Sequence, residues 1–255
     1  MLSASDEGFG SGAPEGIKPA LVYRVSAAEA LAAMSPIPYY VWFLDTETTG
    51  LPPRTRPSPL DTDGWSGCRM VQVAWQLWEC HGDFGAGADG MLEKGSIIVD
   101  PAGAFAIPDA AAQIHGITPE RAAAEGVTWE SGEIVPALQR LIGAADLLVA
   151  HNTEFDVGVV CSELVRCGRN DLADRFLALP KYCTMKNGTL PRARWPRLRD
   201  LYVRLLQREP EGRLHDAQTD VRVCADIYFA LQRLSAASAA PGAGAGASLP
   251  SGAGA

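Results

Sequence analysis

The strongest structural signal in the chain is the segment Tyr39-Tyr40-Val41-Trp42-Phe43-Leu44-Asp45-Thr46-Glu47-Thr48-Thr49-Gly50. Its first six residues are apolar, and the run is too short for a core helix and rich in aromatic and branched side chains. It therefore predicts a strand that is buried on both faces. The run ends in charge, and because residues i and i+2 of a strand project to the same side, Asp45 and Glu47 point toward one place.

Two carboxylates that close together need a partner. At about 4 Å and an effective dielectric near 20, like charges repel by roughly 4 kcal/mol, so the pair persists only if one group is protonated or a cation lies between them. Hard oxygen ligands suit Mg²⁺ or Mn²⁺. Surface strands also commonly end in acidic residues, so an Asp-x-Glu pair alone does not establish a metal site.

The neighbouring segments predict a mixed sheet. Apolar runs at 70–78 and 92–99 follow the first strand, with a Gly-rich connection at 81–90 between them, and the three are expected to form an antiparallel meander. A further buried strand is predicted at 145–150. Helices are predicted after Pro108 and Pro119, and over the ranges 131–142, 154–167, from about 195, and 217–234. Strands that come first and then alternate with helices indicate an α/β domain with helices packed on a mixed sheet.

Two more acidic motifs lie where predicted helices begin. Asn152 and Asp156 follow the strand at 145–150, which makes Asn152 a natural helix cap and places Asp156 in the first turn. There Asp156 could equally serve only to stabilise the helix dipole. His215 and Asp220 flank the start of the last helix, with Asp216 as its predicted cap, so that His215 lies on a loop outside the helix.

These residue types match one kind of chemistry. A histidine with a pKa near 6.5 can accept a proton from water at neutral pH. Two divalent cations roughly 3.5–4 Å apart suit in-line displacement at phosphorus, and the carboxylates supply their ligands.

In this order, the three motifs resemble those of the DEDDh (DnaQ-like) 3′→5′ exonucleases, over about residues 39–234. The resemblance implies a ribonuclease H-like fold with two Mg²⁺ or Mn²⁺ ions on Asp45, Glu47, Asp156 and Asp220. It implies that His215 deprotonates the attacking water. It also implies substrate contacts by a set of groove residues: Thr48, Thr49, Gly50, Leu51, His115 and Asn152. For His115 the alternative is a hydrogen-bonded turn histidine, and His81 and His151 are expected to be structural.

Two features depart from the shortest family members. A Pro-rich insertion occupies residues 52–68, and it either lines the substrate groove or only covers the sheet. Between Lys181 and Arg199 six basic residues occur without an acidic one. These residues either form a solvated face or contact phosphates, and the resemblance of Arg194-Trp195-Pro196-Arg197 to some bacterial and phage-like members favours Arg194 and Arg197 as phosphate contacts.

Composition sets the remaining expectations. The 255 residues carry 22 basic and 30 acidic side chains, a net charge of −8, which argues against a protein that coats nucleic acid nonspecifically. We expect a flexible segment at 1–20, one exonuclease domain at 21–234 and a disordered tail at 235–255, with a small extra helix near Ser26. Six cysteines without a C-x-x-C pair indicate reduced thiols. The absence of a predicted membrane span or secretion signal indicates an intracellular protein.

The sequence leaves several functions open. The first is a metal-dependent 3′→5′ exonuclease that acts on single-stranded DNA or RNA and releases nucleoside 5′-monophosphates, with a separate polymerase as a conceivable partner. The second is a non-catalytic module on the same fold that binds nucleic acid or a polymerase. The third is an endonuclease or phosphodiesterase. DNA and RNA are not distinguished, because recognition of a 2′-hydroxyl depends on details of the pocket.

Overall fold

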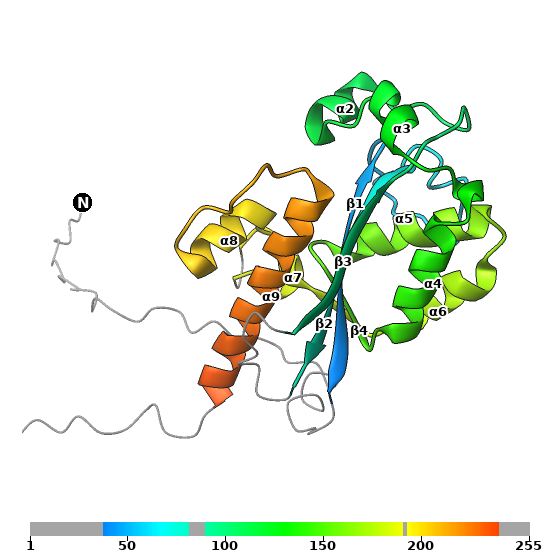
Figure 1. Cartoon of the computed structure of the whole chain (residues 1–255). Helices are drawn as coiled ribbons and strands as arrows, with labels where there is room; N and C mark the ends of the chain where they lie inside the picture. Colours follow the sequence, from blue (N-terminus) through cyan, green and yellow to red (C-terminus); the bar gives the residue numbers. More distant parts are fainter. Residues whose placement is uncertain (1–37, 82–89, 191–192, 240–255) are drawn as a thin grey trace, which may run out of the picture.

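The computed structural model describes residues 38–81, 90–190 and 193–239 (Figure 1). Its centre is a five-stranded sheet in the order β3-β2-β1-β4-β5. The first three strands pair antiparallel, and β4 and β5 continue the sheet in parallel with β1, so the predicted mixed sheet is confirmed. The strands are β1 (Tyr39–Thr48), β2 (Met70–Cys80), β3 (Met91–Ile98), β4 (Leu147–Ala150) and β5 (Lys181–Cys183).

Strand β1 is central because both of its faces are apolar. Val41 and Phe43 point to one side and Trp42 and Leu44 to the other, and all four side chains are fully buried. This alternation places a hydrophobic core on each side of the sheet, which is the arrangement the continuous apolar run predicts.

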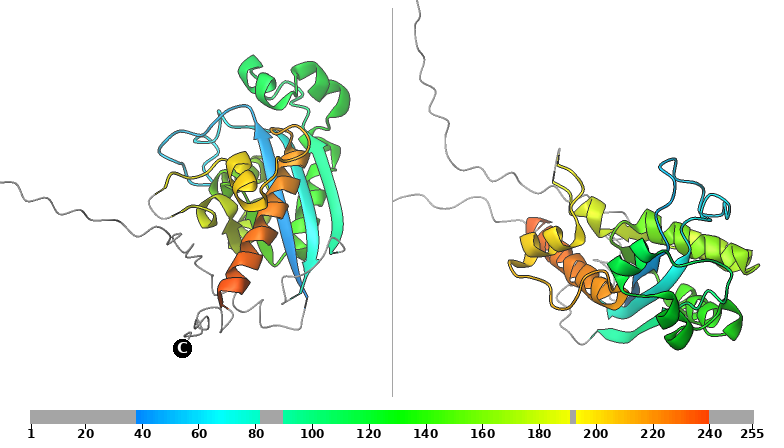
Figure 2. Two further views of the ribbon diagram at one scale, coloured as in Figure 1. Left: turned by 90° about the vertical axis from the view of Figure 1, so that its left-hand side faces the viewer. Right: turned by 90° about the horizontal axis from the view of Figure 1, so that it is seen from above.

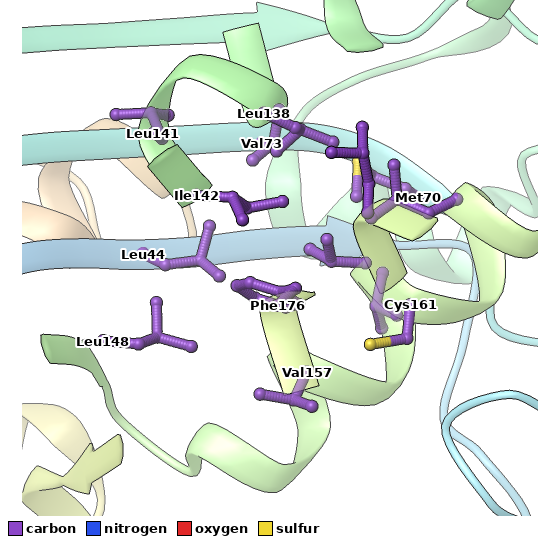
Figure 3. Packing of buried hydrophobic residues seen from close by; sticks show 14 of the residues in the cluster. Leu44, Met70, Val73, Leu138, Leu141, Ile142, Leu148, Val157, Cys161 and Phe176 are labelled. Atoms are coloured by element: carbon purple, nitrogen blue, oxygen red, sulfur yellow. The ribbon is translucent and has the colours of Figure 1, made fainter. Parts of the chain in front are cut away.

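One core lies under α4 (Ile134–Ala144), α5 (Thr153–Arg166) and α6 (Asn170–Ala178). Figure 3 shows Leu44 of β1 and Leu148 of β4 packed against side chains from these helices, including Phe176. The other core lies under α9 (Ala217–Ala239) and α8 (Leu198–Leu206), on the opposite face of the sheet (Figures 1 and 2). There Phe43 packs edge-on against Tyr228, with ring centroids 5.4 Å apart.

Four short elements complete the fold. Helices α2 (Asp109–His115) and α3 (Pro119–Glu125) lie beyond one end of the sheet (Figure 1). A smaller apolar cluster there joins Ala122 of α3 to Val71 of β2 and to Ile107 and Ile117, which flank α2. The 3₁₀ helix η1 (Trp129–Ser131) precedes α4, and α7 (Thr184–Asn187) follows β5.

The insertion at 52–68 is held to the domain by side-chain contacts with α5. The Trp65 side chain is 3% exposed and packs on α5, where Gly158 leaves room for its ring. The buried Glu163 carboxylate accepts two hydrogen bonds from the guanidinium of Arg69, at 2.7 and 3.0 Å. Arg166 donates to the Thr62 carbonyl. These contacts hold the second half of the insertion against α5.

Several predicted boundaries differ from the structure. The helix expected at 131–142 begins at Ile134, because Gly132 adopts a left-handed φ of 81° and ends the preceding 3₁₀ turn. The helix expected from about 195 begins at Leu198, after an extended Arg197. Helix α9 continues to Ala239, five residues past the predicted end. Elements α6, β5 and α7 were not predicted.

Other expectations fall outside the described residues. The small helix near Ser26, the segment at 1–20 and most of the connection at 81–90 lie there, as does the tail beyond Ala239. All six cysteines lie within the described ranges and are free thiols, as expected. Within those ranges, no helix combines the length and apolar character needed to cross a membrane.

Candidate active site

The end of β1 presents two carboxylates on one face of the sheet. Asp45 and Glu47 continue the alternation of Val41 and Phe43, so they lie on the face that α9 covers. Glu47 is 9% exposed. The intervening Thr46 projects toward the opposite face, so side chains from both faces of the strand contribute to the site.

Asp156 reaches the same place from the other layer. It lies in the first turn of α5, which follows β4, and it is 2% exposed. The Thr46 hydroxyl donates a 2.9 Å hydrogen bond to its Oδ1. This bond joins the strand that carries Asp45 to the helix that carries Asp156.

Asn152 does not cap α5 in the predicted way. It precedes the helix with a left-handed φ of 78°, and its side chain makes no cap hydrogen bond. Its Oδ1 atom is buried without a hydrogen-bond partner among the described residues. The chain must turn sharply between β4 and α5, and the left-handed conformation, which Asn tolerates better than most residues, directs the amide toward the groove instead of the helix backbone.

The last two residues of the site are Asp220, in the first turn of α9, and His215, just before that helix. Asp216 caps the helix as predicted, because its Oδ2 accepts hydrogen bonds from the Thr219 amide at 3.2 Å and hydroxyl at 3.0 Å. His215 lies just outside the helix, is exposed, and has a left-handed backbone conformation with φ 60°. Its amide donates to Asp220 Oδ2 at 3.2 Å. Ligand atoms of Glu47, His215 and Asp220 all lie within 4.8 Å of one another.

Burial raises the pKa of all four carboxyl groups, and neighbouring carboxylates add to the shift at Asp45, Glu47 and Asp220. Burial, reinforced by Asp156, Asp220 and Glu47, holds the pKa of Asp45 well above its usual range. Burial, reinforced by Asp220, Asp156 and Asp216, raises the pKa of Glu47 to about 8. Burial raises the pKa of Asp156 to about 7, although its hydrogen bond from Thr46 opposes the shift, and raises that of Asp220 to about 6.

The donor set fits divalent cations. Four carboxylates from β1, α5 and α9 converge, and only oxygen donors and one imidazole are offered, as hard cations prefer. Asp220 Oδ1 is buried without a hydrogen-bond partner within the described part of the chain. A cation would offset the repulsion that raises these pKa values and would satisfy that oxygen.

The carboxylates lie in a groove of about 670 Å³. Leu51 forms part of its wall with 82% of its surface exposed, and Arg197 and Trp195 line it as well. Arg194 is exposed but does not line it. Of the residues predicted to contact substrate, the groove brings together all the others: Thr48, Thr49, Gly50, Leu51, His115, Asn152 and Arg197.

His115 is a hydrogen-bonded turn histidine that also lines the groove. It is the last residue of α2, and its Nδ1 accepts a 3.0 Å hydrogen bond from the Ile117 amide, as a turn histidine would. That bond places the hydrogen of the neutral ring on Nε2. Burial lowers the pKa of His115, so the ring is neutral and offers a donor beside the backbone of Thr48, in the groove wall.

Sequence reasoning missed the positioning residues. The role of Thr46 is hidden because it alternates with the acidic pair. His151 is structural as expected: its ring nitrogens lie 3.0 Å from the Thr184 hydroxyl and 3.1 Å from the Pro196 carbonyl, so it fixes the segment that carries Trp195 and Arg197. Burial lowers the pKa of His151 to about 4, so the ring is neutral.

The fold has known counterparts among solved structures. The zinc-bound E. coli exonuclease I–ssDNA complex aligns at a TM-score of 0.56 and 20% identity over 77% of this chain and 42% of its own. Exonuclease I of Methylocaldum szegediense aligns at 0.54 and 20% identity over 76% and 40%. E. coli exonuclease I with a dT13 oligonucleotide aligns at 0.55 and 18% identity over 78% and 42%.

The extent of these likenesses is limited. The chain spans about two fifths of the length of the exonuclease I structures, and identity near one fifth shows the shared fold. No curated protein matches the chain in sequence. The exonuclease family RNase_T matches residues 42–228, a range that contains all four carboxylates and His215. The chain therefore belongs to the RNase_T exonuclease family.

Proposed function

We propose that the protein is a metal-dependent 3′→5′ exonuclease acting on single-stranded nucleic acid. It hydrolyses the phosphodiester bond at the 3′ end and releases nucleoside 5′-monophosphates. The observation that carries the proposal is the convergence of four buried or partly buried carboxylates with an exposed histidine in one groove.

In this proposal Asp45, Glu47, Asp156 and Asp220 would hold two Mg²⁺ or Mn²⁺ ions. Ions bound there would offset the charge of the phosphate and lower the pKa of a water molecule. His215 accepts the proton of the attacking water. Its exposure and its place outside α9 let the imidazole meet solvent while its amide remains tied to Asp220.

The groove residues position the terminal nucleotide. The backbone at 48–50 approaches the sugar, and the exposed Leu51 packs against the base. The neutral His115 donates a hydrogen bond from Nε2, and Asn152 offers its Oδ1, which has no hydrogen-bond partner among the described residues. The DNA oligonucleotides bound to the exonuclease I structures favour DNA as the substrate, with RNA as the alternative.

A non-catalytic binding module is the second candidate function. Such a module needs no complete ligand set, whereas here every carboxylate of the motif is present and lines the groove. A polymerase partner remains a prediction that no described residue tests.

The test is degradation of matched 5′-labelled single-stranded DNA and RNA, with Mg²⁺ and with EDTA. Wild type is compared with Asp45→Ala and His215→Ala. Matched controls are Asp200→Ala, which removes an exposed carboxylate outside the groove, and His81→Ala, which removes an exposed histidine paired with Glu79. A DNA substrate with a blocked 3′ end separates an exonuclease from an endonuclease.

We expect a metal-dependent ladder that shortens from the 3′ end, retained in both controls. Asp45→Ala and His215→Ala are expected to lose about 10²-fold or more in rate, the usual contribution of positioned acid–base groups and metal ligands. Binding without cleavage would contradict the enzymatic proposal and favour the binding module. Cleavage of the blocked substrate would contradict the exonuclease polarity.

A further inference from the structure

A second cavity adjoins the groove and is not used by the chemistry described above. It measures about 880 Å³ and lies between the insertion, the start of α5, and the β5–α7 region. Leu51, Asn152 and Phe155 line both the cavity and the groove, so the two are continuous. Its size lies within the roughly 300–1,000 Å³ typical of ligand sites. We call it the insertion chamber.

The insertion chamber has the opposite charge to the groove. Four cations line it, and Glu154 is its one acidic lining residue, in a chain whose net charge is −8. Prolines of the insertion, with Phe155 and Trp65, supply apolar surface between the charges. Cations that follow a backbone, combined with aromatic and apolar surface for bases, are what single-stranded nucleic acid requires. The cations are Arg54, Arg56, Lys181 and Lys186.

Glu154 bridges two of these cations. Its two carboxylate oxygens accept separate hydrogen bonds, one from Arg56 and one from Lys186. The side chains of these three residues are 42–52% exposed, and pairs so exposed contribute only about 0–1 kcal/mol. A phosphate matches the geometry of the Arg56 guanidinium as well as a carboxylate does and can replace Glu154 at little cost.

The walls of the insertion chamber are fixed. Trp65 is wedged against Gly158 of α5, and its ring nitrogen donates to the Ser58 carbonyl at 3.0 Å. Arg56 also lies 5.7 Å from the centre of the Trp195 ring, which lines the groove. Arg56 therefore links the two cavities at the point where a strand would pass from one to the other.

We infer that the insertion chamber binds a backbone phosphate of the substrate strand on the 5′ side of the scissile bond, and that this phosphate displaces Glu154 from Arg56 and Lys186. The inference rests on the proposed function, since it requires the strand's 3′ end to lie in the groove. The insertion thereby extends recognition beyond the terminal nucleotide, and Glu154 acts as an internal counter-ion that the strand releases.

The test compares binding of a ten-nucleotide oligothymidylate and a thymidine dinucleotide, both 5′-labelled, by fluorescence anisotropy in EDTA so that neither is cleaved. Variants are Glu154→Gln, Arg56→Ala and Lys186→Ala. The matched control is Glu125→Gln, an exposed carboxylate that pairs with Arg121 outside both cavities. Thermal unfolding of each variant checks that it remains folded.

We expect Glu154→Gln to raise the ratio of affinities for the long and short oligonucleotides at least threefold, because the competing anion is gone. Arg56→Ala and Lys186→Ala are expected to lower that ratio about fivefold. Each is also expected to reduce the slope of log affinity against log salt concentration by about 0.7, the value for one phosphate contact on a single strand. Glu125→Gln should leave the ratio at the wild-type value.

The sign of the Glu154→Gln effect separates the inference from a structural role. If Glu154 only holds the insertion in place, its loss weakens binding of the longer strand, and the inference is overturned. An unchanged ratio in all three variants would overturn it as well. Cleavage of the dinucleotide in Mg²⁺ by wild type reports on the proposed function separately, so the two can fail independently.

Discussion

Thr46 is the residue through which the two layers of the site meet. It lies between Asp45 and Glu47 in sequence but on the opposite face of β1, where its hydroxyl donates to Asp156 Oδ1 at 2.9 Å. That bond stabilises the charged carboxylate and lowers its pKa against the effect of burial. Thr46 is thus a positioning residue that acts through Asp156.

Thr46→Val should therefore shift the pH dependence of cleavage. Without the hydrogen bond the pKa of Asp156 rises further, so the carboxylate is charged, and able to bind a cation, only at higher pH. We expect the acidic limb of the rate profile to move upward by about one unit, with roughly fivefold lower activity at pH 7. Thr46→Ser, which keeps the hydroxyl, is the control. An unshifted limb in the Val variant would show that the bond has no influence on Asp156.

Asp156 itself should limit the stability of the metal-free protein. Because its folded-state pKa is raised to about 7, the folded protein binds more protons than the unfolded chain between about pH 4 and pH 7. Stability from this group is therefore present at low pH and is lost as the pH rises through 7.

Asp156→Asn removes that loss. In EDTA at pH 8 we expect the variant to unfold at a higher denaturant concentration than wild type, by on the order of 2 kcal/mol, while cleavage is abolished. At pH 4 the difference should nearly vanish, because the wild-type carboxyl is then protonated in the folded state and about half protonated in the unfolded chain. A variant less stable than wild type at pH 8 would mean that the charged Asp156 is not strained in the absence of metal.

Helix α5 contributes both to the candidate active site and to the support of the insertion. Its first turn supplies Asp156 and Glu154, and its middle supports the insertion through Gly158, where a Cβ atom would come within 1.9 Å of the Trp65 ring. Gly158 thus permits the helix and the insertion to pack in contact.

Gly158→Ala should displace the insertion. The clash with Trp65 is expected to cost about 1–3 kcal/mol of stability, the range for overpacked cores, and to weaken binding of long single strands more than of a dinucleotide. Gly143→Ala in α4 is the matched control, since its Cβ would meet only Arg175, at 3.6 Å, and alanine favours a helix. Chemical denaturation and anisotropy measure both effects. Equal stability of the two variants would contradict the role of Gly158.

The sequence predicted the strands and helices that have a clear apolar pattern or a proline at their start, and it missed α6, β5 and α7. Strand β1 and helix α9 are marked by continuous or helically spaced apolar residues, and the carboxylates stand at their ends. Strand β5 has three residues, Lys181–Cys183, and its pairing with β4 depends on tertiary context. The prediction that Asn152 caps α5 with its side chain is wrong for a related reason, because the β4–α5 turn sets its backbone conformation.

The basic stretch after Lys181 shows the same limit. The sequence treats it as one strip, yet the structure divides its members between two cavities and the surface. Lys186 lines the insertion chamber, Arg197 lines the groove, and Arg199 pairs with Glu209 at 2.6 Å. Arg192 lies outside the described residues. Linear spacing could not reveal this division, since it depends on how β5, α7 and α8 are stacked.

The packing of helices on both faces of the sheet brings the carboxylates close enough to repel one another. Helix α5 packs on one face of the sheet and α9 on the other, and both begin at the end where β1 delivers Asp45 and Glu47. The apolar cores on both faces fix these three elements, so the charges cannot move apart. The fold thus holds ready a site that is unfavourable until a cation binds.

Metal binding should consequently stabilise the whole domain in a pH-dependent way. With pKa values of about 8 for Glu47, 7 for Asp156 and 6 for Asp220, the metal-free carboxyls gain protons as the pH falls from 8 to 5. A cation must displace those protons, so its apparent affinity falls over the same range. Because a ligand stabilises by RT ln(1 + [L]/Kd), 10 mM Mg²⁺ should raise the melting temperature several degrees at pH 8 and far less at pH 5. Asp45→Asn serves as the control, and it should reduce the rise at pH 8. If Mg²⁺ stabilised wild type and Asp45→Asn equally, or equally at both pH values, the cation would be acting elsewhere on the molecule.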